Sequence, residues 1–295
     1  MTLFIITIEW RLLQDIIGRL CRLFNLYIEH MELTNLLFQP PIYNGSHKYI
    51  VANGVPVFLY KHTSSNHSRQ CGVRNLHDSR RCGGRNSHDS RRCGGRNPHY
   101  HILYFHGNAE DAPRSMESVK NLADRLSSYV YVVEYPGYSV YNSQSPSVDR
   151  VIQDAETVYR WLIKTVQPKH IIIVGLSIGT GPASHLAQNP VALTVLLAPF
   201  TSICDLVYER VGMLSWLVKD SFCNRLCLEK TRCPVLLVHG ISDTLIPYTH
   251  SETLAKCSDK CQILLVQAGH NTISHHWSTI LDRVEKMLSP TTDKR

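Results

Sequence analysis

A serine at position 177 stands between two glycines, in the pattern G-x-S-x-G formed by residues 175–179. An apolar run, 170–174, precedes this pattern, and a helix-like stretch follows it. A strand, a sharp turn and a helix in that order expose the serine hydroxyl, and the glycines allow the backbone to crowd there. A serine becomes a nucleophile when a base and oxyanion donors stand beside it. The pattern therefore predicts a nucleophilic Ser177.

The base and its supporting carboxylate are expected downstream, each just after a predicted strand. Asp243 follows the apolar run 233–240, and His270 follows the run 262–266. The order Ser, Asp, His is that of α/β-hydrolases. Because the carboxyl ends of parallel strands share one edge of a sheet, we expect the three side chains to meet there. They would act as nucleophile, orienting carboxylate and base.

The oxyanion hole is expected from the upstream half of the chain. An apolar strand, 101–105, runs into the turn 106–111, which begins with His-Gly. We assign the two donors to the backbone N–H groups of Asn108 and Ile178, the residue after the nucleophile.

Simpler interpretations exist for each residue alone. Asp243 could cap a turn. His106 and His239 each precede a glycine at a strand end, which is typical of structural residues. His275 and His276 are rivals to His270 as the base, but they fall inside the next helical stretch.

The pattern of the whole chain predicts one α/β domain. With 295 residues and 43% hydrophobic content, the chain can bury one large core. Continuous apolar runs of strand length occur at 101–105, 130–134, 170–174, 193–198, 234–239 and 262–266. Helical stretches are expected at 115–127, 147–166, 178–188 and 249–256. This alternation predicts a mostly parallel central sheet with helices on both faces. Runs 48–52 and 55–59, joined by Asn53-Gly54, predict a hairpin that forms an antiparallel N-terminal edge.

The net charge of +7 is concentrated in one segment. Residues 68–99 contain eight arginines and two aspartates, which together account for +6. The rest of the chain is nearly neutral, so no nucleic-acid partner is expected.

That segment is an eleven-residue repeat rich in Arg, Gly, Cys and His. It has few apolar residues to bury, so we interpret 62–99 as a disordered insertion between two strands. Cys71, Cys82 and Cys93 interleave with histidines, which would suit zinc, but no C-x-x-C knuckle is present. We expect no metal and no cofactor. An alternative is that the arginines contact acidic lipids or RNA.

The N-terminal segment, 1–36, is expected to associate with a membrane. Residues 10–28 form an amphipathic helical pattern, with Trp10 at one end and arginines opposite an apolar face. Cys21 could carry an acyl chain as a second anchor. The alternative is that this helix docks on the body of the protein. The irregularly spaced cysteines indicate reduced thiols, so we expect a cytoplasmic protein peripheral to a membrane.

Taken together, six motifs resemble the α/β-hydrolase-domain protein 17 group. They lie at residues 106–111, 134–139, 175–180, 198–202, 239–243 and 269–271. The resemblance covers roughly 37–288, and Ser177, Asp243 and His270 match the triad positions of the group. It implies a membrane-associated serine hydrolase that removes palmitate from protein cysteines.

We therefore expect a domain at 37–290, interrupted by the insertion and followed by a tail at 291–295. The expected substrate is an acylated protein or an acyl lipid. Alternatives are a lipid esterase, such as a monoacylglycerol lipase or lysophospholipase, and a catalytically silent membrane scaffold. A candidate acyl pocket comes from Leu206, Met213, Leu214 and Trp216, whose other interpretation is an ordinary buried helix.

Overall fold

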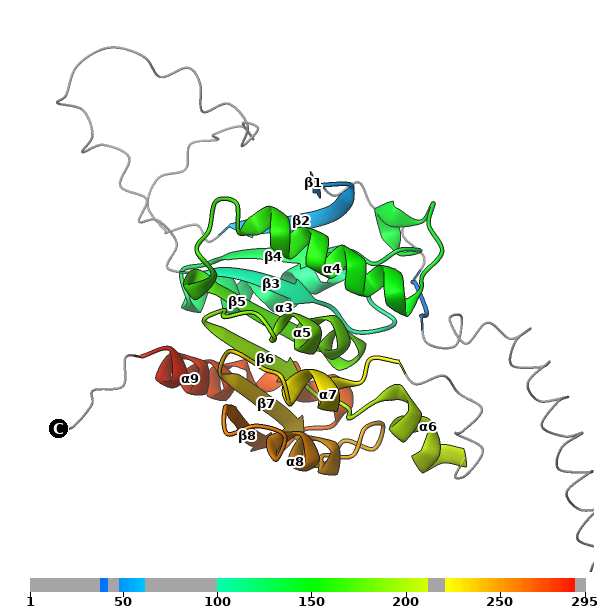
Figure 1. Ribbon diagram of the computed structural model, residues 1–295, viewed down its shortest axis with the longest axis vertical. Helices are drawn as coiled ribbons and strands as arrows, with labels where there is room; N and C mark the ends of the chain where they lie inside the picture. Colours follow the sequence, from blue (N-terminus) through cyan, green and yellow to red (C-terminus); the bar gives the residue numbers. More distant parts are fainter. Residues whose placement is uncertain (1–37, 42–47, 62–99, 212–220, 290–295) are drawn as a thin grey trace, which may run out of the picture.

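The computed structural model describes residues 38–41, 48–61, 100–211 and 221–289 (Figure 1). The predicted membrane segment, the arginine-rich repeat and the C-terminal tail lie outside these ranges. Within the described helices, none is both long enough and apolar enough to cross a membrane.

Eight strands form one sheet in the order β1-β2-β4-β3-β5-β6-β7-β8. In chain order they are β1 (Ile50–Ala52), β2 (Val55–Lys61), β3 (His101–Phe105), β4 (Tyr129–Val133), β5 (Ile171–Leu176), β6 (Leu193–Leu197), β7 (Val235–Gly240) and β8 (Cys261–Val266). The first two pairings are antiparallel, and every pairing from β4 to β8 is parallel. The predicted fold class, with its antiparallel N-terminal edge, is confirmed.

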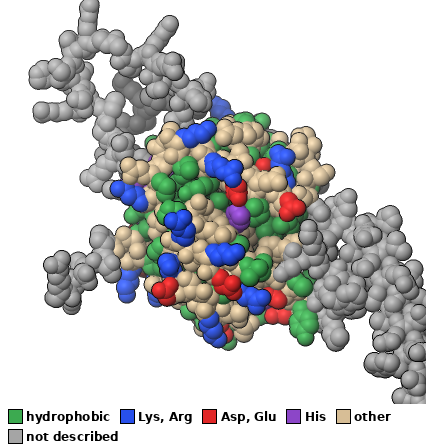
Figure 2. Space-filling view, in the orientation of Figure 1, with side chains coloured by type: hydrophobic (Ala, Val, Ile, Leu, Met, Phe, Trp, Pro, Cys, Tyr) green, Lys and Arg blue, Asp and Glu red, His purple; other side chains and the backbone are tan. Residues whose placement is uncertain are grey.

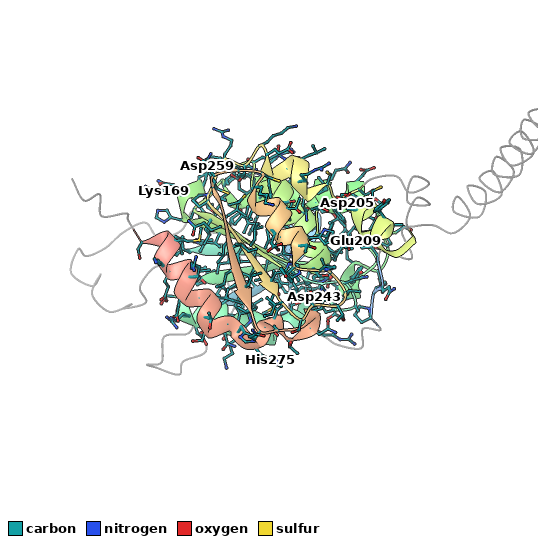
Figure 3. The ribbon with its side chains drawn as sticks, turned by 90° about the horizontal axis from the view of Figure 1, so that it is seen from below. Lys169, Asp205, Glu209, Asp243, Asp259 and His275 are labelled. Atoms are coloured by element: carbon teal, nitrogen blue, oxygen red, sulfur yellow. The ribbon has the colours of Figure 1, made fainter. Side chains whose placement is uncertain are left out.

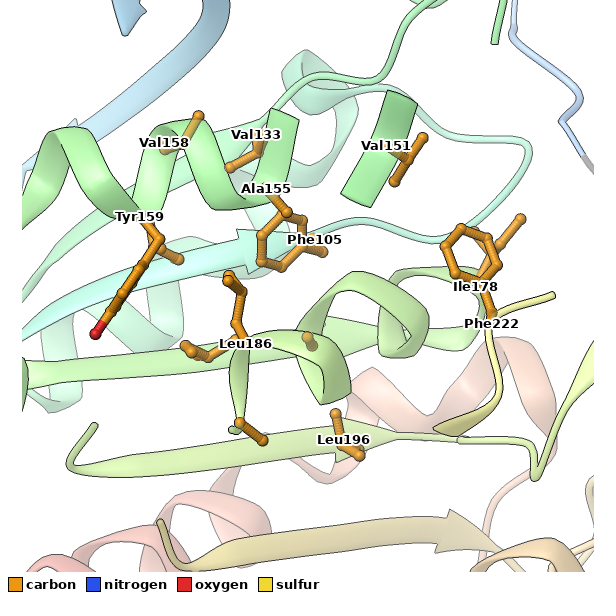
Figure 4. Close-up of a cluster of buried hydrophobic side chains, with 14 of the residues drawn as sticks. Phe105, Val133, Val151, Ala155, Val158, Tyr159, Ile178, Leu186, Leu196 and Phe222 are labelled. Carbon is orange, nitrogen blue, oxygen red and sulfur yellow. The ribbon is translucent and has the colours of Figure 1, made fainter. Parts of the chain in front are cut away.

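Helices cover both faces of the sheet because both faces of its strands are apolar. The α-helices within the described residues are α3 (Ala112–Arg125), α4 (Val148–Leu162), α5 (Thr180–Leu186), α6 (Ile203–Val211), α7 (Asn224–Leu228), α8 (Thr249–Ala255) and α9 (Trp277–Leu288). Side chains of α4, α5, α7 and α8 bury one face, and Figure 4 shows part of this cluster, with Ala155 above Phe105 and Leu186 below it. Side chains of α3 and α9 bury the other face. Two separate cores therefore hold the sheet rigid between them.

The hairpin between β1 and β2 turns through two residues, since Ala52 pairs with Val55. Asn53 and Gly54 adopt φ of 51° and 95°. Positive φ at both central positions is the type I′ geometry that matches the twist of the strands, and Asn-Gly is the pair that tolerates it.

Helix α3 begins three residues earlier than the sequence pattern predicts. The Asp111 side chain accepts a hydrogen bond from the Arg114 amide at 3.0 Å and so caps the helix. Pro113 fits the first turn, where no N–H is needed. The apolar periodicity becomes visible only later, which explains the difference.

The repeat-bearing segment, 62–99, connects to the sheet at the edge where the parallel strands begin. On β4, Tyr129 pairs with Lys61 of β2 on one side and with His101 of β3 on the other. The chain leaves the sheet after Lys61 and re-enters it before His101. The residues that follow the strands lie at the opposite edge: Figure 3 shows Asp243 and His275 far from Lys169 and Asp259, which precede strands.

Within the described ranges, the cysteines carry thiols and not disulfides: Cys204, Cys223, Cys227, Cys233, Cys257 and Cys261. None of the described His, Cys, Asp and Glu side chains gather in a group that could hold a metal ion. On the face shown in Figure 2, basic side chains are interspersed with acidic and apolar ones.

Candidate active site

Ser177 occupies a sharp turn between β5 and α5. The turn is a short 3-10 segment, Ser177–Gly179, and Ser177 itself has a φ of 52°. Left-handed backbone is uncommon for a residue with a side chain and costs free energy, so it persists only where its surroundings enforce it. The consequence is a half-buried Ser177 at the carboxyl edge of the sheet, where it lines a cavity.

The two glycines of the pattern are required by close backbone contacts. A β-carbon on Gly175 would overlap the carbonyl oxygen of Gly179 and the side chain of Ala183. One on Gly179 would overlap the carbonyl oxygen of Phe105, at the end of β3. The G-x-S-x-G pattern thus fixes the turn against the strand that leads to the predicted oxyanion loop.

The structure brings Ser177, His270 and Asp243 together. His270 Nε2 lies 3.0 Å from Ser177 Oγ, and His270 Nδ1 lies 2.7 Å from Asp243 Oδ2. Asp243 follows β7, whereas His270 opens a 3-10 segment, His270–His276, after β8 and so is not in an irregular loop. This geometry can relay a proton from the hydroxyl to the imidazole while the carboxylate orients the ring.

Asp243 also caps the turn that follows it, as its simpler interpretation predicts. Its Oδ1 accepts hydrogen bonds from the amides of Leu245 at 2.9 Å and Ile246 at 2.8 Å. Burial alone would raise the pKa of Asp243, but hydrogen bonding from His239, His270 and the Ile246 amide holds that pKa well below its usual range. The side chain therefore stays a carboxylate that can stabilise an imidazolium.

The other histidines do not contact Ser177, although His239 shares Asp243 with His270, its Nε2 lying 3.5 Å from Oδ2. His239 is fully buried, with Nε2 2.8 Å from the Ile246 carbonyl and Nδ1 2.6 Å from Ser251 Oγ. His276 Nε2 lies 3.0 Å from the Gln267 carbonyl oxygen, and the His275 side chain is exposed. His270 alone among these four lies within hydrogen-bond distance of Ser177.

The loop after β3 carries Asn108, whose side chain is held by two groups from distant parts of the chain. Asn108 Oδ1 accepts from the Gln39 amide at 2.8 Å and from the Tyr138 hydroxyl at 2.9 Å. Phe38 packs edge-on against Tyr138. These contacts fix the loop beside Ser177, whose neighbour Ile178 is buried. The oxyanion role of the Asn108 and Ile178 amides stays a prediction.

Comparison with known proteins identifies the fold and the proteins that this chain resembles. No protein-family model matches the chain. The chain is 30% identical over 197 residues to human "Alpha/beta hydrolase domain-containing protein 17B", which covers 64% of this chain. Est1E of Butyrivibrio proteoclasticus, solved with ferulic acid bound, superposes with a TM-score of 0.56 at 14% identity, over 82% of this chain and 97% of its own. An esterase of Pyrococcus furiosus gives a TM-score of 0.53 at 16% identity, over 65% of this chain and 83% of its own.

This chain has the α/β-hydrolase fold. Within that superfamily its sequence is similar to the domain-containing protein 17 group, as the motifs predict. The aligned segment spans 66% of the human relative, just under two thirds of its length. The likeness to the two solved structures is one of fold.

A buried ion pair supports the loop that carries the predicted oxyanion donor. His106 Nε2 lies 3.1 Å from Glu134 Oε1, and its Nδ1 lies 2.8 Å from the Gly107 carbonyl oxygen. Glu134 Oε2 accepts from the Ser139 hydroxyl at 2.6 Å and the Ala112 amide at 3.2 Å. Burial lowers the pKa of His106, but the hydrogen bond and charge of Glu134 outweigh that effect, so the pKa is raised.

Changing Glu134 to Gln is therefore expected to destabilise the fold by about 3 kcal/mol, with a specific pH dependence. Because the folded-state pKa of His106 is raised, the pair's contribution is full below pH 6.5 and is lost as pH rises through the folded-state pKa. Urea unfolding between pH 6 and 8.5 should show the wild-type advantage shrinking with pH.

Glu156 to Gln is the matched control for that experiment. Glu156 also pairs with a histidine, His185, at 2.8 Å, but both side chains are about a third exposed. This change is expected to alter the free energy of unfolding by less than about 1 kcal/mol. Parallel pH curves for wild type and Glu134→Gln would contradict the ion-pair assignment.

A cavity of about 500 Å³ opens at Ser177. Its apolar lining includes Leu176, Leu197, Ile273 and Trp277. The loop after β3 also lines it, through residues 107–110. This size is within the usual range for small-molecule sites.

The predicted acyl-pocket residues are not among the described lining residues of this cavity. Leu206 lies on α6 and packs against the core on the α4–α5 face, which corresponds to its simpler interpretation as part of a partly buried helix. The cavity itself is lined by α3 and α9 side chains, from the other face of the sheet. Met213, Leu214 and Trp216 lie outside the described residues.

Two contributors to the site are not evident from the sequence. Gln39 lines the cavity, and Glu134 supports the loop beside it. Gln39 lies in the segment Phe38-Gln39-Pro40-Pro41, and Glu134 begins the motif at 134–139. Both segments belong to the family resemblance, but the sequence does not indicate which groups these two residues contact.

Proposed function

We propose that this α/β-hydrolase is a serine hydrolase that cleaves acyl esters or thioesters. The observation that carries the proposal is the continuous hydrogen-bonded chain from Ser177 through His270 to Asp243, with 3.0 and 2.7 Å between the atoms. The fold it shares with an esterase supports the same reaction class.

In the acylation step, Ser177 Oγ attacks the carbonyl carbon of the substrate. The hydroxyl proton passes to His270 Nε2, and Asp243 stabilises the imidazolium through Nδ1–H. The negative charge that develops on the carbonyl oxygen is stabilised by the amides of Asn108 and Ile178, each donor contributing about 3 kcal/mol in comparable sites.

Collapse of this intermediate breaks the bond to the leaving group, which takes the proton from His270 and departs as a thiol or alcohol. Ser177 then carries the acyl group. A water molecule gives its proton to His270 and attacks the acyl-enzyme, and the same residues release the carboxylic acid and restore the serine.

The substrate we propose is a palmitoyl-cysteine thioester of a protein. The resemblance to the domain-containing protein 17 group implies this activity, and the apolar lining from Leu176, Leu197, Ile273 and Trp277 is suited to an acyl chain. We further propose that the protein acts in the cytoplasm, peripheral to a membrane, through residues 1–36.

Hydrolysis of a lipid ester is the second candidate, because the same triad would cleave it. For lysophospholipids the cavity is poorly suited: its described lining contains no Lys or Arg to bind a phosphate. A catalytically silent scaffold would not need the Ser177–His270 contact or the left-handed backbone at Ser177, which costs free energy.

Three substrates with the same palmitoyl group would test this function. We expect the purified full chain to hydrolyse a palmitoyl-cysteine peptide with a kcat/KM at least about tenfold above those for monopalmitoylglycerol and a palmitoyl lysophospholipid, a difference of about 1.4 kcal/mol in transition-state free energy. Free palmitate released from each would be measured by mass spectrometry. Faster hydrolysis of either lipid would contradict the depalmitoylase assignment, and no hydrolysis of any would favour the scaffold.

A further inference from the structure

One acidic side chain faces the cavity at Ser177. Among its described lining residues, Glu110 is the one carboxylate, and none of them is Lys or Arg. The only other titratable side chains there are His270, the proposed base, and the buried Tyr104. A negative charge therefore stands in the cavity without a cationic side chain among these residues to neutralise it.

Glu110 is held in place by the loop that bears it. Its Oε1 accepts a hydrogen bond from the Gly107 amide at 2.9 Å, across the turn that contains Asn108. The next residue, Asp111, is the N-cap of α3. Glu110 thus lies on the same turn as the proposed oxyanion donor Asn108, two residues along the chain. The hydrogen bond from the Gly107 amide restricts the rotation of the Glu110 side chain and so fixes the position of its carboxylate.

The charge of Glu110 acts on the wall of the cavity. Burial and then the charge of Glu110 raise the pKa of Tyr104, which lines the cavity. The same charge acts on Tyr135 and His106, whose cationic form is already paired with Glu134. Asp243, which contacts His270, adds a second negative charge near the cavity. It is not itself one of the residues that line the cavity.

We propose that Glu110 selects substrates by charge: the site accepts esters and thioesters with a neutral or cationic group next to the scissile bond and rejects those with an anionic group. A like charge brought into a partly enclosed site raises the free energy of the bound state, and an opposite charge lowers it. The inference rests on the proposed hydrolase function, because it concerns the same cavity.

The substrate class that follows is an acylated cysteine flanked by Lys or Arg. Such a peptide would place positive charge near Glu110, whereas a phosphate-bearing lipid or an acyl chain ending in a carboxylate would place negative charge there. Glu110 would thus separate two substrate types that the triad itself does not distinguish.

Three butyryl thioesters that differ in the charge of a similarly sized leaving group would test the inference. Butyrylthiocholine carries +1, S-(3,3-dimethylbutyl) thiobutyrate is neutral, and S-butyryl-3-mercaptopropionate carries −1. At low ionic strength we expect wild-type kcat/KM to fall about tenfold at each step from cation to anion, and the spread to narrow in about 1 M salt. In Glu110→Gln, which keeps an oxygen to accept from Gly107, the cation-to-anion ratio is expected to fall from about 100 to below about 10.

Asp259→Asn is the matched control, because it removes one negative charge at the opposite edge of the sheet (Figure 3). The Asp259→Asn variant should have the same cation-to-anion ratio of kcat/KM as the wild type. Equal kcat/KM values for the three thioesters in wild type, or an unchanged ratio in a folded Glu110→Gln enzyme, would overturn the inference alone. A wild-type protein inactive both on these three thioesters and on a palmitoyl-cysteine peptide would overturn the proposed function as well. If it cleaved the peptide alone, palmitoyl thioesters of the same three leaving groups would decide the inference. Should Glu110→Gln not fold, the wild-type order and its dependence on salt still decide the question.

Discussion

Replacing Ser177 with alanine is expected to lower kcat/KM for any ester or thioester substrate by about 10⁴-fold or more. The reason is that the acyl-enzyme cannot form without Oγ, which lies 3.0 Å from His270 Nε2. Weak residual activity over water is expected from the oxyanion hole and substrate binding. The measurements are steady-state hydrolysis of a p-nitrophenyl ester and covalent labelling by a fluorophosphonate.

The matched control is Ser278→Ala, since Ser278 is exposed on α9 and is not among the described residues that line the cavity at Ser177. It should label and turn over at the wild-type rate. Wild-type labelling of Ser177→Ala would show that the nucleophile is another residue.

Removing the base is expected to be as damaging as removing the nucleophile. His270→Ala should lose about 10⁴-fold or more, and Asp243→Asn about 10³- to 10⁴-fold, because the carboxylate orients the ring without touching the substrate. The Ser177→Ala, His270→Ala double variant should be no slower than either single variant, since the residues act as a unit. Single-turnover hydrolysis of the p-nitrophenyl ester would measure all four proteins.

His276→Ala serves as the control for that series, because His276 lies six residues further along the same 3-10 segment and binds the Gln267 carbonyl oxygen. It should retain wild-type activity. The base would have to be reassigned if this variant were inactive while His270→Ala remained active.

The fold could be predicted from the sequence because its parallel strands are continuous apolar runs. Both faces of β5 and β6 are buried, so these strands stand out without any knowledge of their partners. The order of Ser177, Asp243 and His270 along the chain, each after a strand, was enough to place them at one edge. The hairpin at Asn53-Gly54 was readable because its turn needs two residues with positive φ.

The rest of the site depends on contacts that no local pattern encodes. The Gln39 amide bonds to Asn108, 69 residues away, through its backbone, so its side-chain type gives no signal. The cavity is assembled from segments between Gln39 and Trp277. Leu206 looked suited to a pocket because it is apolar, yet apolar residues serve the core and a pocket equally well, and only the face of the sheet distinguishes them.

The register around Tyr129 has a consequence for how the gene for this chain can vary. Lys61 and His101 flank the same residue of β4, so two strand spacings, about 10 Å, separate the points where the repeat-bearing segment begins and ends. About three extended residues bridge that distance. Tandem duplication or loss of eleven-residue units between these two points therefore leaves every strand pairing unchanged, at the edge farthest from Ser177. The strand register therefore sets no limit on the number of repeats between Lys61 and His101.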